Sequence, residues 1–131
     1  DGSFGTFARA VMEGVAFSIR DCADAVMAGT RGDTPIPLGG GAANSRVWSQ
    51  IFADVLGRPI RRLRNSETET LGDIIIAAHA AGIREIPLDF GKCLAESGEL
   101  LFPNKDNAAM YDSLFEKYKE LYMRVKPIYG K

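Results

Sequence analysis

Three consecutive glycines, Gly39 to Gly41, lie between a short apolar stretch, Ile36 to Leu38, and an amphipathic run that begins near Ser45. Glycine has no Cβ atom, so it reaches positive φ angles and allows another molecule to approach the backbone closely. In parallel sheets, ligands bind beyond the carboxyl ends of strands, where a loop leads into a helix N-terminus. A tight turn before a capped helix is the competing explanation, because the run matches neither a dinucleotide-binding motif nor a phosphate-binding loop.

Apolar residues recur at helical spacing in four parts of the chain. We expect helices over Thr6–Ala28, Ser45–Leu56 and Glu67–Ala81, and a last helix from Asn104 to Pro127. The predicted inner face of the first helix consists of Phe7, Val11, Met12, Val15, Ile19, Cys22 and Val26. The face of the last helix consists of Met110, Tyr111, Leu114, Phe115, Tyr118, Leu121, Tyr122 and Val125. The predicted inner face of the third helix, Glu67–Ala81, consists of Leu71, Ile75 and Ala78. Ser66 and Glu69 match a capping box at the start of that helix.

Two short strands are expected, one around Ile36 and one over Pro59–Arg64. Pro35 and Pro37 each remove a backbone donor, which favours an edge position for the first strand. Residues 83–103 show no clear period and are expected to form a loop with one turn of helix at most. Strands that alternate with helices indicate a parallel α/β arrangement with short connections.

Composition excludes several classes of function. The chain has 131 residues, enough for one domain, and a formal net charge of −1 without long blocks of one sign. We therefore expect small-molecule or protein partners, and neither nucleic acid nor a membrane. Cys22 and Cys93 are far apart and no apolar run approaches ~20 residues, which favours a reduced, cytoplasmic protein. The chain opens on Asp1 without methionine, so we expect a piece of a longer protein.

The polar candidates for chemistry have simpler explanations. His79 is the only histidine and has no nearby cysteine or carboxylate at metal-ligand spacing, so we interpret it as a solvated or core residue. The arginines at positions 61, 62 and 64 could contact a phosphate, but their alternation with Ile60 and Leu63 is explained more simply by the solvated face of a strand. The tyrosines of the last helix are expected in packing, with their hydroxyl groups at the rim.

The sequence GGGAANSRVWSQIFADVLGRPI, residues 39–60, resembles the adenosine-binding segment of the FGGY carbohydrate kinases. In that family a glycine-rich loop and its helix continue through glutamine, alanine, aspartate and glycine into a strand that follows proline. The matching residues are Gln50, Ala53, Asp54, Gly57, Pro59 and Ile60. Two family helices are resembled, in the same order, by the flanking stretches RAVMEGVAFSIRD, Arg9 to Asp21, and ETETLGDIIIAAHAAG, Glu67 to Gly82. The segment from Pro103 to Tyr122 fits the family's C-terminal helix.

The resemblance implies that residues 1–131 are the C-terminal portion of an actin-like, ribonuclease-H-like ATPase domain, helix-rich with two short strands. It implies an ATP-dependent sugar kinase that uses Mg²⁺, with a xylulose-like substrate favoured. The implied nucleotide-binding residues are Gly39, Gly40, Gly41, Ala42, Asn44 and Ser45. Asn44 and Ser45 are both kept because the sequence permits two registers against the family.

In the family, the catalytic aspartate, the phosphate loop and the sugar pocket belong to an N-terminal part. We therefore expect no catalytic or metal-binding residue in this chain, and no activity from the chain by itself. Two residues depart from the family pattern. Thr6 stands where the family usually has a histidine or an acidic residue, and Asp73 stands where it has alanine.

A non-catalytic module for protein interaction or self-association is the alternative function, based on apolar faces around Val15, Trp48 and Tyr122. Two short strands and a long apolar helix would leave edges and apolar surface uncovered. We therefore also expect the chain to form a homo-oligomer.

Overall fold

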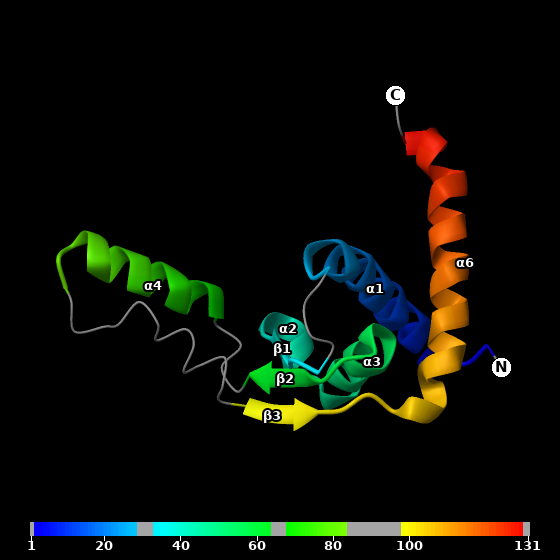
Figure 1. The fold of residues 1–131 in the computed structure, drawn as a ribbon, viewed down its shortest axis with the longest axis horizontal. Helices are drawn as coiled ribbons and strands as arrows, with labels where there is room; N and C mark the ends of the chain where they lie inside the picture. The colour runs from blue at the N-terminus through cyan, green and yellow to red at the C-terminus, as the bar shows by residue number, and fades with distance from the viewer. Residues whose placement is uncertain (1, 29–32, 64–67, 84–97, 130–131) are drawn as a thin grey trace.

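The structure, a computed structural model, describes residues 2–28, 33–63, 68–83 and 98–129 (Figure 1). The predicted helices are confirmed with small shifts of their ends, and a third strand is present that the sequence did not predict. In chain order the elements are α1 (Phe4–Val26), β1 (Ile36–Leu38), α2 (Gly40–Ala43), α3 (Arg46–Leu56), β2 (Ile60–Leu63), α4 (Thr68–Ala80), β3 (Gly98–Leu101) and α6 (Lys105–Tyr129).

The three strands form one sheet in the order β1-β2-β3. β1 and β2 are parallel, with Ile36 opposite Ile60, as the alternation of strands and helices predicted. β2 and β3 are antiparallel, with Ile60 opposite Leu101. The connection from β1 to β2 passes through α2 and α3, so the glycine turn lies at the carboxyl end of a parallel strand.

The strand β3 corrects the expectation of a loop over residues 83–103 and of only two strands. Its sequence, Gly98-Glu99-Leu100-Leu101, contains glycine and glutamate, which have low strand propensity, so pairing with β2 decides its conformation. Glycine is required at position 98 because a Cβ atom there would collide with the backbone carbonyl of Arg62. β3 thereby forms the edge of the sheet on the side of β2 that faces away from β1.

The helix α3 lies at the centre of the core. Its residues Ser49 and 51–55 are buried, and α1, α2, α6, β2 and β3 all contact it. The helix ends at Gly57, which has a left-handed φ of 63° and confirms the predicted glycine stop. The buried hydrophobic cluster consists of Ala16, Phe17, Ile51, Phe52, Ala53, Val55, Ile60, Leu101, Tyr111 and Phe115.

The helix α1 packs on a different face from the predicted one. Ala16 and Phe17 are buried in the core, and Met12 is partly buried against it. The predicted inner residues Phe7, Val11, Val15, Ile19 and Val26 are exposed, with 69% exposure at Phe7. Both sides of α1 are apolar, and helical spacing alone does not indicate which side meets a neighbour. We call the exposed residues Phe4, Phe7, Val11, Val15, Ile19 and Val26 the outer stripe.

Aromatic rings join α1 to α6. The ring of Phe17 lies 6.1 Å from the rings of Tyr111 and Phe115 and 5.8 Å from that of Tyr118, between ring centroids. The guanidinium of Arg20 lies 4.3 Å above the ring of Phe115 and donates to Asp112 Oδ1 at 2.7 Å. These contacts bury Tyr111 and Phe115, which confirms the prediction that both residues of α6 face inward.

The C-terminal half of α6 extends away from the other elements (Figure 1). Leu121 and Tyr122, which were predicted to face inward, are exposed there. The helix also continues past its predicted end at Pro127 to Tyr129. Proline removes the hydrogen bond of its own N–H, but it does not prevent the next residues from bonding to carbonyls upstream.

The helix α4 lies on the far side of the strands from α1 and α6 (Figure 1). Ile75 and Ala78 are buried as predicted, and Asp73 is exposed. The predicted capping box at Ser66 and Glu69 and the inward position of Leu71 lie outside the part that the structure describes. Within the described residues, no helix combines the length and apolar character that crossing a bilayer requires.

Phe17→Ala should lower the free energy of unfolding of the chain by about 3–5 kcal/mol, because it removes a buried ring from the contact between α1 and α6. Val11→Ala, on the outer stripe, should change it by about 0.5 kcal/mol or less. Urea denaturation of both variants measures the difference. Equal losses would contradict the face on which α1 packs.

Candidate functional site

The glycine turn has a conformation that depends on one of its three glycines. Gly39 precedes α2 in an extended conformation, and Gly40 has a φ of 68°, in the left-handed region that favours glycine. Gly41 has an ordinary φ, and a Cβ atom there would meet no other atom of the described chain within 4 Å. The left-handed backbone therefore explains a glycine at position 40, whereas neither backbone conformation nor packing within the described chain explains why residue 41 lacks a side chain.

Asn44 and Ser45 follow α2 and have separate roles. Ser45 is the N-cap of α3, and its Oγ accepts a hydrogen bond from the backbone N–H of Trp48 at 3.2 Å. Asn44 is the last residue of the turn, and its side chain is exposed. The structure thus gives Ser45 a capping role in the chain itself and leaves the side chain of Asn44 exposed.

A hollow of about 430 Å³ lies where β2 ends and β3 begins. It is lined by Ala43, Asn44, Arg62, Leu63 and Glu99. Of the six residues nominated from the sequence, Asn44 lines this hollow. Gly39, Gly40, Gly41, Ala42 and Ser45 do not line it, although they belong to the turn that ends beside it. We call this cavity the turn hollow.

Two arginines share one carboxylate at the turn hollow. Arg46 Nε donates to Glu99 Oε1 and Arg62 Nη1 donates to Glu99 Oε2, both at 2.9 Å. The group carries two positive charges and one negative charge. Arg62 also donates through Nε to the carbonyl of Ala43. The interpretation of Arg62 as part of a merely solvated face was therefore wrong, since its guanidinium joins the sheet to the end of α2.

Hydrogen bonds from Arg46 and Arg62 hold the pKa of Glu99 below its usual value. Because the pKa is lowered on folding, the stabilising contribution of Glu99 is present above the unfolded pKa and is lost as the pH falls through the folded pKa. The carboxylate is therefore charged and paired at neutral pH. Sequence reasoning missed Glu99 because it lies on the strand that was not predicted.

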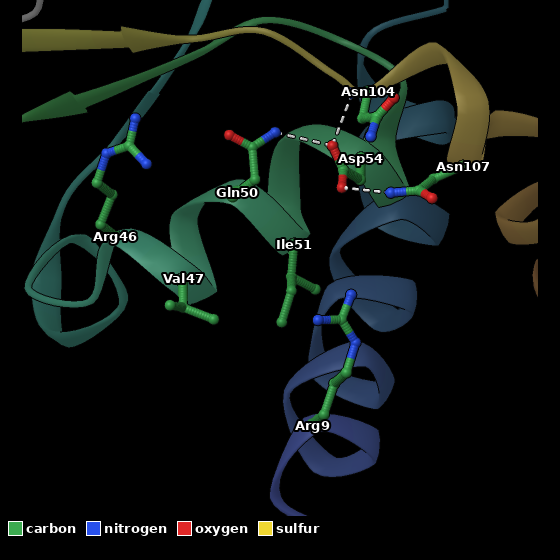
Figure 2. Close-up of a pocket in the computed structure, with 8 residues that line it drawn as sticks. All are labelled: Arg9, Arg46, Val47, Gln50, Ile51, Asp54, Asn104 and Asn107. Atoms are coloured by element: carbon green, nitrogen blue, oxygen red, sulfur yellow. Dashed lines mark hydrogen bonds between the residues drawn. The ribbon is translucent and has the colours of Figure 1, made fainter. Parts of the chain in front are cut away.

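A second cavity, of about 580 Å³, lies between α3, α1 and the start of α6 (Figure 2). It is lined by Arg9, Arg46, Val47, Gln50, Ile51, Asp54, Asn104 and Asn107. Arg46 borders this cavity and pairs with Glu99, which lines the turn hollow, so one ion pair joins the linings of the two cavities. Figure 2 shows that six of the eight lining residues have charged or amide side chains, and that Val47 and Ile51 are the two apolar ones.

Asp54 holds the start of α6 against α3. Its Oδ1 accepts from Gln50 Nε2 and from the backbone N–H of Asn104, both at 2.8 Å. Its Oδ2 accepts from Asn107 Nδ2 at 3.2 Å (Figure 2). The side chain is buried, so these three donors replace the water that the carboxylate loses on folding. This matched residue of the glycine-loop segment thus has a structural role.

Tyr111 differs from the expectation that the tyrosine hydroxyls lie at the rim. It is fully buried, and its hydroxyl donates to Glu13 Oε1 at 2.8 Å and accepts from Arg9 Nη2 at 2.9 Å. Burial and the bond to Glu13 raise the pKa of Tyr111. The phenol is therefore protonated at neutral pH, and its contribution to stability is lost only as the pH rises through that raised value.

The remaining polar candidates add no ligand cluster. His79 Nδ1 lies 3.3 Å from the carbonyl of Ile75, one turn earlier in α4. Among the residues that the structure describes, no three side chains of histidine, cysteine, aspartate or glutamate form a group that could hold a metal ion. Cys22 is a free, exposed cysteine on α1.

Asp54→Asn should lower the free energy of unfolding by about 1–3 kcal/mol, because the amide nitrogen cannot accept from Asn107 and leaves two donors facing each other. Adding Asn107→Asp should recover part of this loss, since an acceptor then faces the new amide. Asp73→Asn, at an exposed site on α4, is the control. Chemical denaturation of the four chains checks this, and failure of the double variant to recover any stability would contradict the assigned pairing.

Comparison with known proteins places this geometry in a family. Residues 2–81 match the FGGY family of carbohydrate kinases, C-terminal domain. The xylulose kinase of Staphylococcus epidermidis is 30% identical over 122 residues, which are 93% of this chain and 25% of that protein. The glycerol kinase of Myxococcus xanthus is 43% identical over 81 residues, 61% of this chain and 16% of that protein. The chain thus spans about a quarter or less of the length of these relatives.

Solved structures agree with the sequence relatives. The ligand-bound xylulose kinase from Lactobacillus acidophilus matches 95% of this chain and 25% of its own, with a TM-score of 0.76 and 30% identity. The xylulose kinase from Rhodospirillum rubrum matches 100% of this chain and 27% of its own, with a TM-score of 0.75 and 28% identity. The fold is therefore that of the C-terminal portion of an actin-like ATPase domain, and the chain belongs to the FGGY family of carbohydrate kinases.

Proposed function

We propose that this chain is the nucleotide-binding part of an ATP-dependent carbohydrate kinase, in which the glycine turn receives the adenosine end of ATP. The observation that carries the proposal is Gly41. A side chain at this position would meet open space, so the chain itself gives no packing reason for a glycine there. Close approach of a flat ring requires a bare backbone, and the turn that contains Gly41 ends beside the turn hollow.

The surroundings of the turn support a nucleotide more than a neutral ligand. Gly39–Ala43 follow the carboxyl end of a parallel strand, where α/β folds bind ligands. The cluster of Arg46, Glu99 and Arg62 adds one unbalanced positive charge next to the turn hollow. We propose Asn44 as a ligand contact, because its amide is exposed and lines the hollow. Ser45 would act mainly through the start of α3.

The reaction of the whole protein is inferred from its relatives. We propose transfer of the γ-phosphoryl group of ATP, with Mg²⁺, to a hydroxyl of a sugar, with a xylulose-like substrate favoured because xylulose kinases match most of the chain. Such reactions depend on positioning and charge stabilisation. We also propose that catalysis needs parts of the longer protein, so the chain alone is inactive, and that the protein acts in the cytoplasm.

Gly41→Val should weaken ATP binding by the full-length kinase by about 1–3 kcal/mol, roughly five- to 150-fold, because the branched side chain occupies the space reserved for the nucleoside. The open space around residue 41 means that folding should be unaffected. Titration calorimetry with ATP and with sugar measures the effect.

Gly41→Ala, which adds only a Cβ atom, should give a smaller loss, and the affinity for the sugar should stay the same in both variants. An unchanged ATP affinity in Gly41→Val would mean that the turn has a structural role and that the nucleotide binds elsewhere.

A second candidate, an interaction or self-association module, is favoured by the outer stripe of α1. Phe4 and Phe7 are 86% and 69% exposed, and Val11 continues the stripe one turn later. Large exposed apolar patches mark surfaces that bind other proteins or copies of the same chain. If the stripe drives association, the isolated chain forms a dimer or a larger species.

Val11→Lys should shift the isolated chain toward a monomer, because a charge placed in the middle of the stripe cannot be buried at low cost. Sedimentation velocity over a hundredfold range of concentration measures this. Asp21→Lys, on the same helix, is the control. A monomer at every concentration in the unmodified chain would contradict self-association.

A further inference from the structure

The turn before α3 has few bonds of its own to hold it in place. The helix α2 has four residues and no side-chain cap, and Gly40 adds freedom at its start. Two bonds from outside the turn hold its C-terminal end. Ser49 Oγ donates to the carbonyl of Ala42 at 3.1 Å, and Arg62 Nε donates to the carbonyl of Ala43. The position of the turn therefore depends on one buried serine of α3 and one arginine of the sheet.

Arg62 is held where it is needed by its neighbours on the sheet. It lies on the middle strand, opposite Leu38 on β1 and Glu99 on β3. Its Nη1 is bound by Glu99 Oε2 while Nε reaches Ala43, so one planar guanidinium makes both contacts. A guanidinium presents its donors in a fixed fork, whereas the single ammonium of lysine does not.

These contacts do not contribute much to stability. The side chains of Arg62 and Glu99 are 28% and 41% exposed, and ion pairs in contact with water add little to the free energy of folding. The same two residues line the turn hollow together with Ala43 and Asn44. Their arrangement therefore affects the shape of the hollow more than the stability of the chain.

We propose that Arg62, oriented by Glu99, is a positioning residue that fixes the end of the glycine turn and thereby sets the affinity for the nucleoside. The inference rests on the proposed function. Arg62 acts through the backbone carbonyl of Ala43 and Glu99 acts through Arg62. Neither sequence motif nor strand prediction indicated this pair, because Glu99 lies on β3.

The test compares ATP with adenosine as ligands of the full-length protein. Arg62→Lys keeps the positive charge but loses the forked donors of the guanidinium. It should therefore lower the affinity for both ligands by the same factor, roughly three- to tenfold, which corresponds to the loss of about one hydrogen bond. The affinity for the sugar and the Tm should stay almost the same. Arg61→Lys is the matched control, because adjacent strand residues point to opposite faces and Arg61 does not line the hollow.

Glu99→Gln tests the orienting contact. The glutamine side chain has one acceptor oxygen in place of the two carboxylate oxygens that bind Arg46 and Arg62. The affinity for both ligands should therefore fall again. Combined with Arg62→Lys, the losses should be less than additive, because the two residues act through one contact. Additive losses would overturn the claim that Glu99 acts through Arg62.

The remaining outcomes separate this inference from the proposed function. If Arg62→Lys lowers the affinity for ATP but not the affinity for adenosine, the guanidinium binds phosphate directly and the positioning role is wrong. If the unmodified protein binds both ligands and Arg62→Lys binds them equally well, this inference alone is wrong. If the unmodified protein binds neither ligand, the proposed function and the inference fail together.

Discussion

The burial of α3 is the constraint on which the other described elements depend. Its residues 51–55 are buried in succession, which an amphipathic surface helix does not allow, so neighbours must cover it on several sides. The helices α1 and α6 and the strands β2 and β3 supply that cover. The glycine turn enters this helix directly through Ser45, so the packing of α3 also determines where the turn lies.

The helix α3 lines the second cavity and is joined to the turn hollow by one ion pair. Arg46, at its first turn, pairs with Glu99 and borders the second cavity, and Asp54, near its other end, binds the start of α6. A shift of α3 would therefore move the Arg46–Glu99 ion pair and the end of the glycine turn together. The position of the proposed nucleotide site thus depends on core packing around α3, and we infer that the half-buried Arg62 and its partner Glu99 adjust its shape.

The helix α1 has one buried and one exposed apolar side, in a chain that spans about a quarter of the length of its relatives. One side of the helix is buried through Ala16 and Phe17, while the outer stripe keeps large apolar side chains exposed. Apolar burial is favourable in proportion to the area removed from water, so the stripe gains free energy from any partner that covers it. This supports the proposal that the chain works with a further protein surface.

The sequence by itself determined the local features. Helical spacing and Gly57 located α3, the alternation of strand and helix indicated the parallel pair β1 and β2, and the three glycines marked the corner between them. These features depend on residues close together in the chain, where propensity and capping act directly. The turn on which the proposed nucleotide site is placed was therefore predictable from the sequence, and Asn44 lies beside its hollow. The binding role of these residues stays a prediction.

Only the tertiary structure decided the features that depend on distant residues. The strand β3 exists because Gly98 permits close approach to β2, and it brings Glu99 to Arg62, 37 positions away in the chain. The face of α1 that packs was decided by contact with α3 and α6, since both sides of the helix are apolar. Propensity and period describe one segment at a time, whereas strand pairing and the choice of a helix face are set by which partner surface is available.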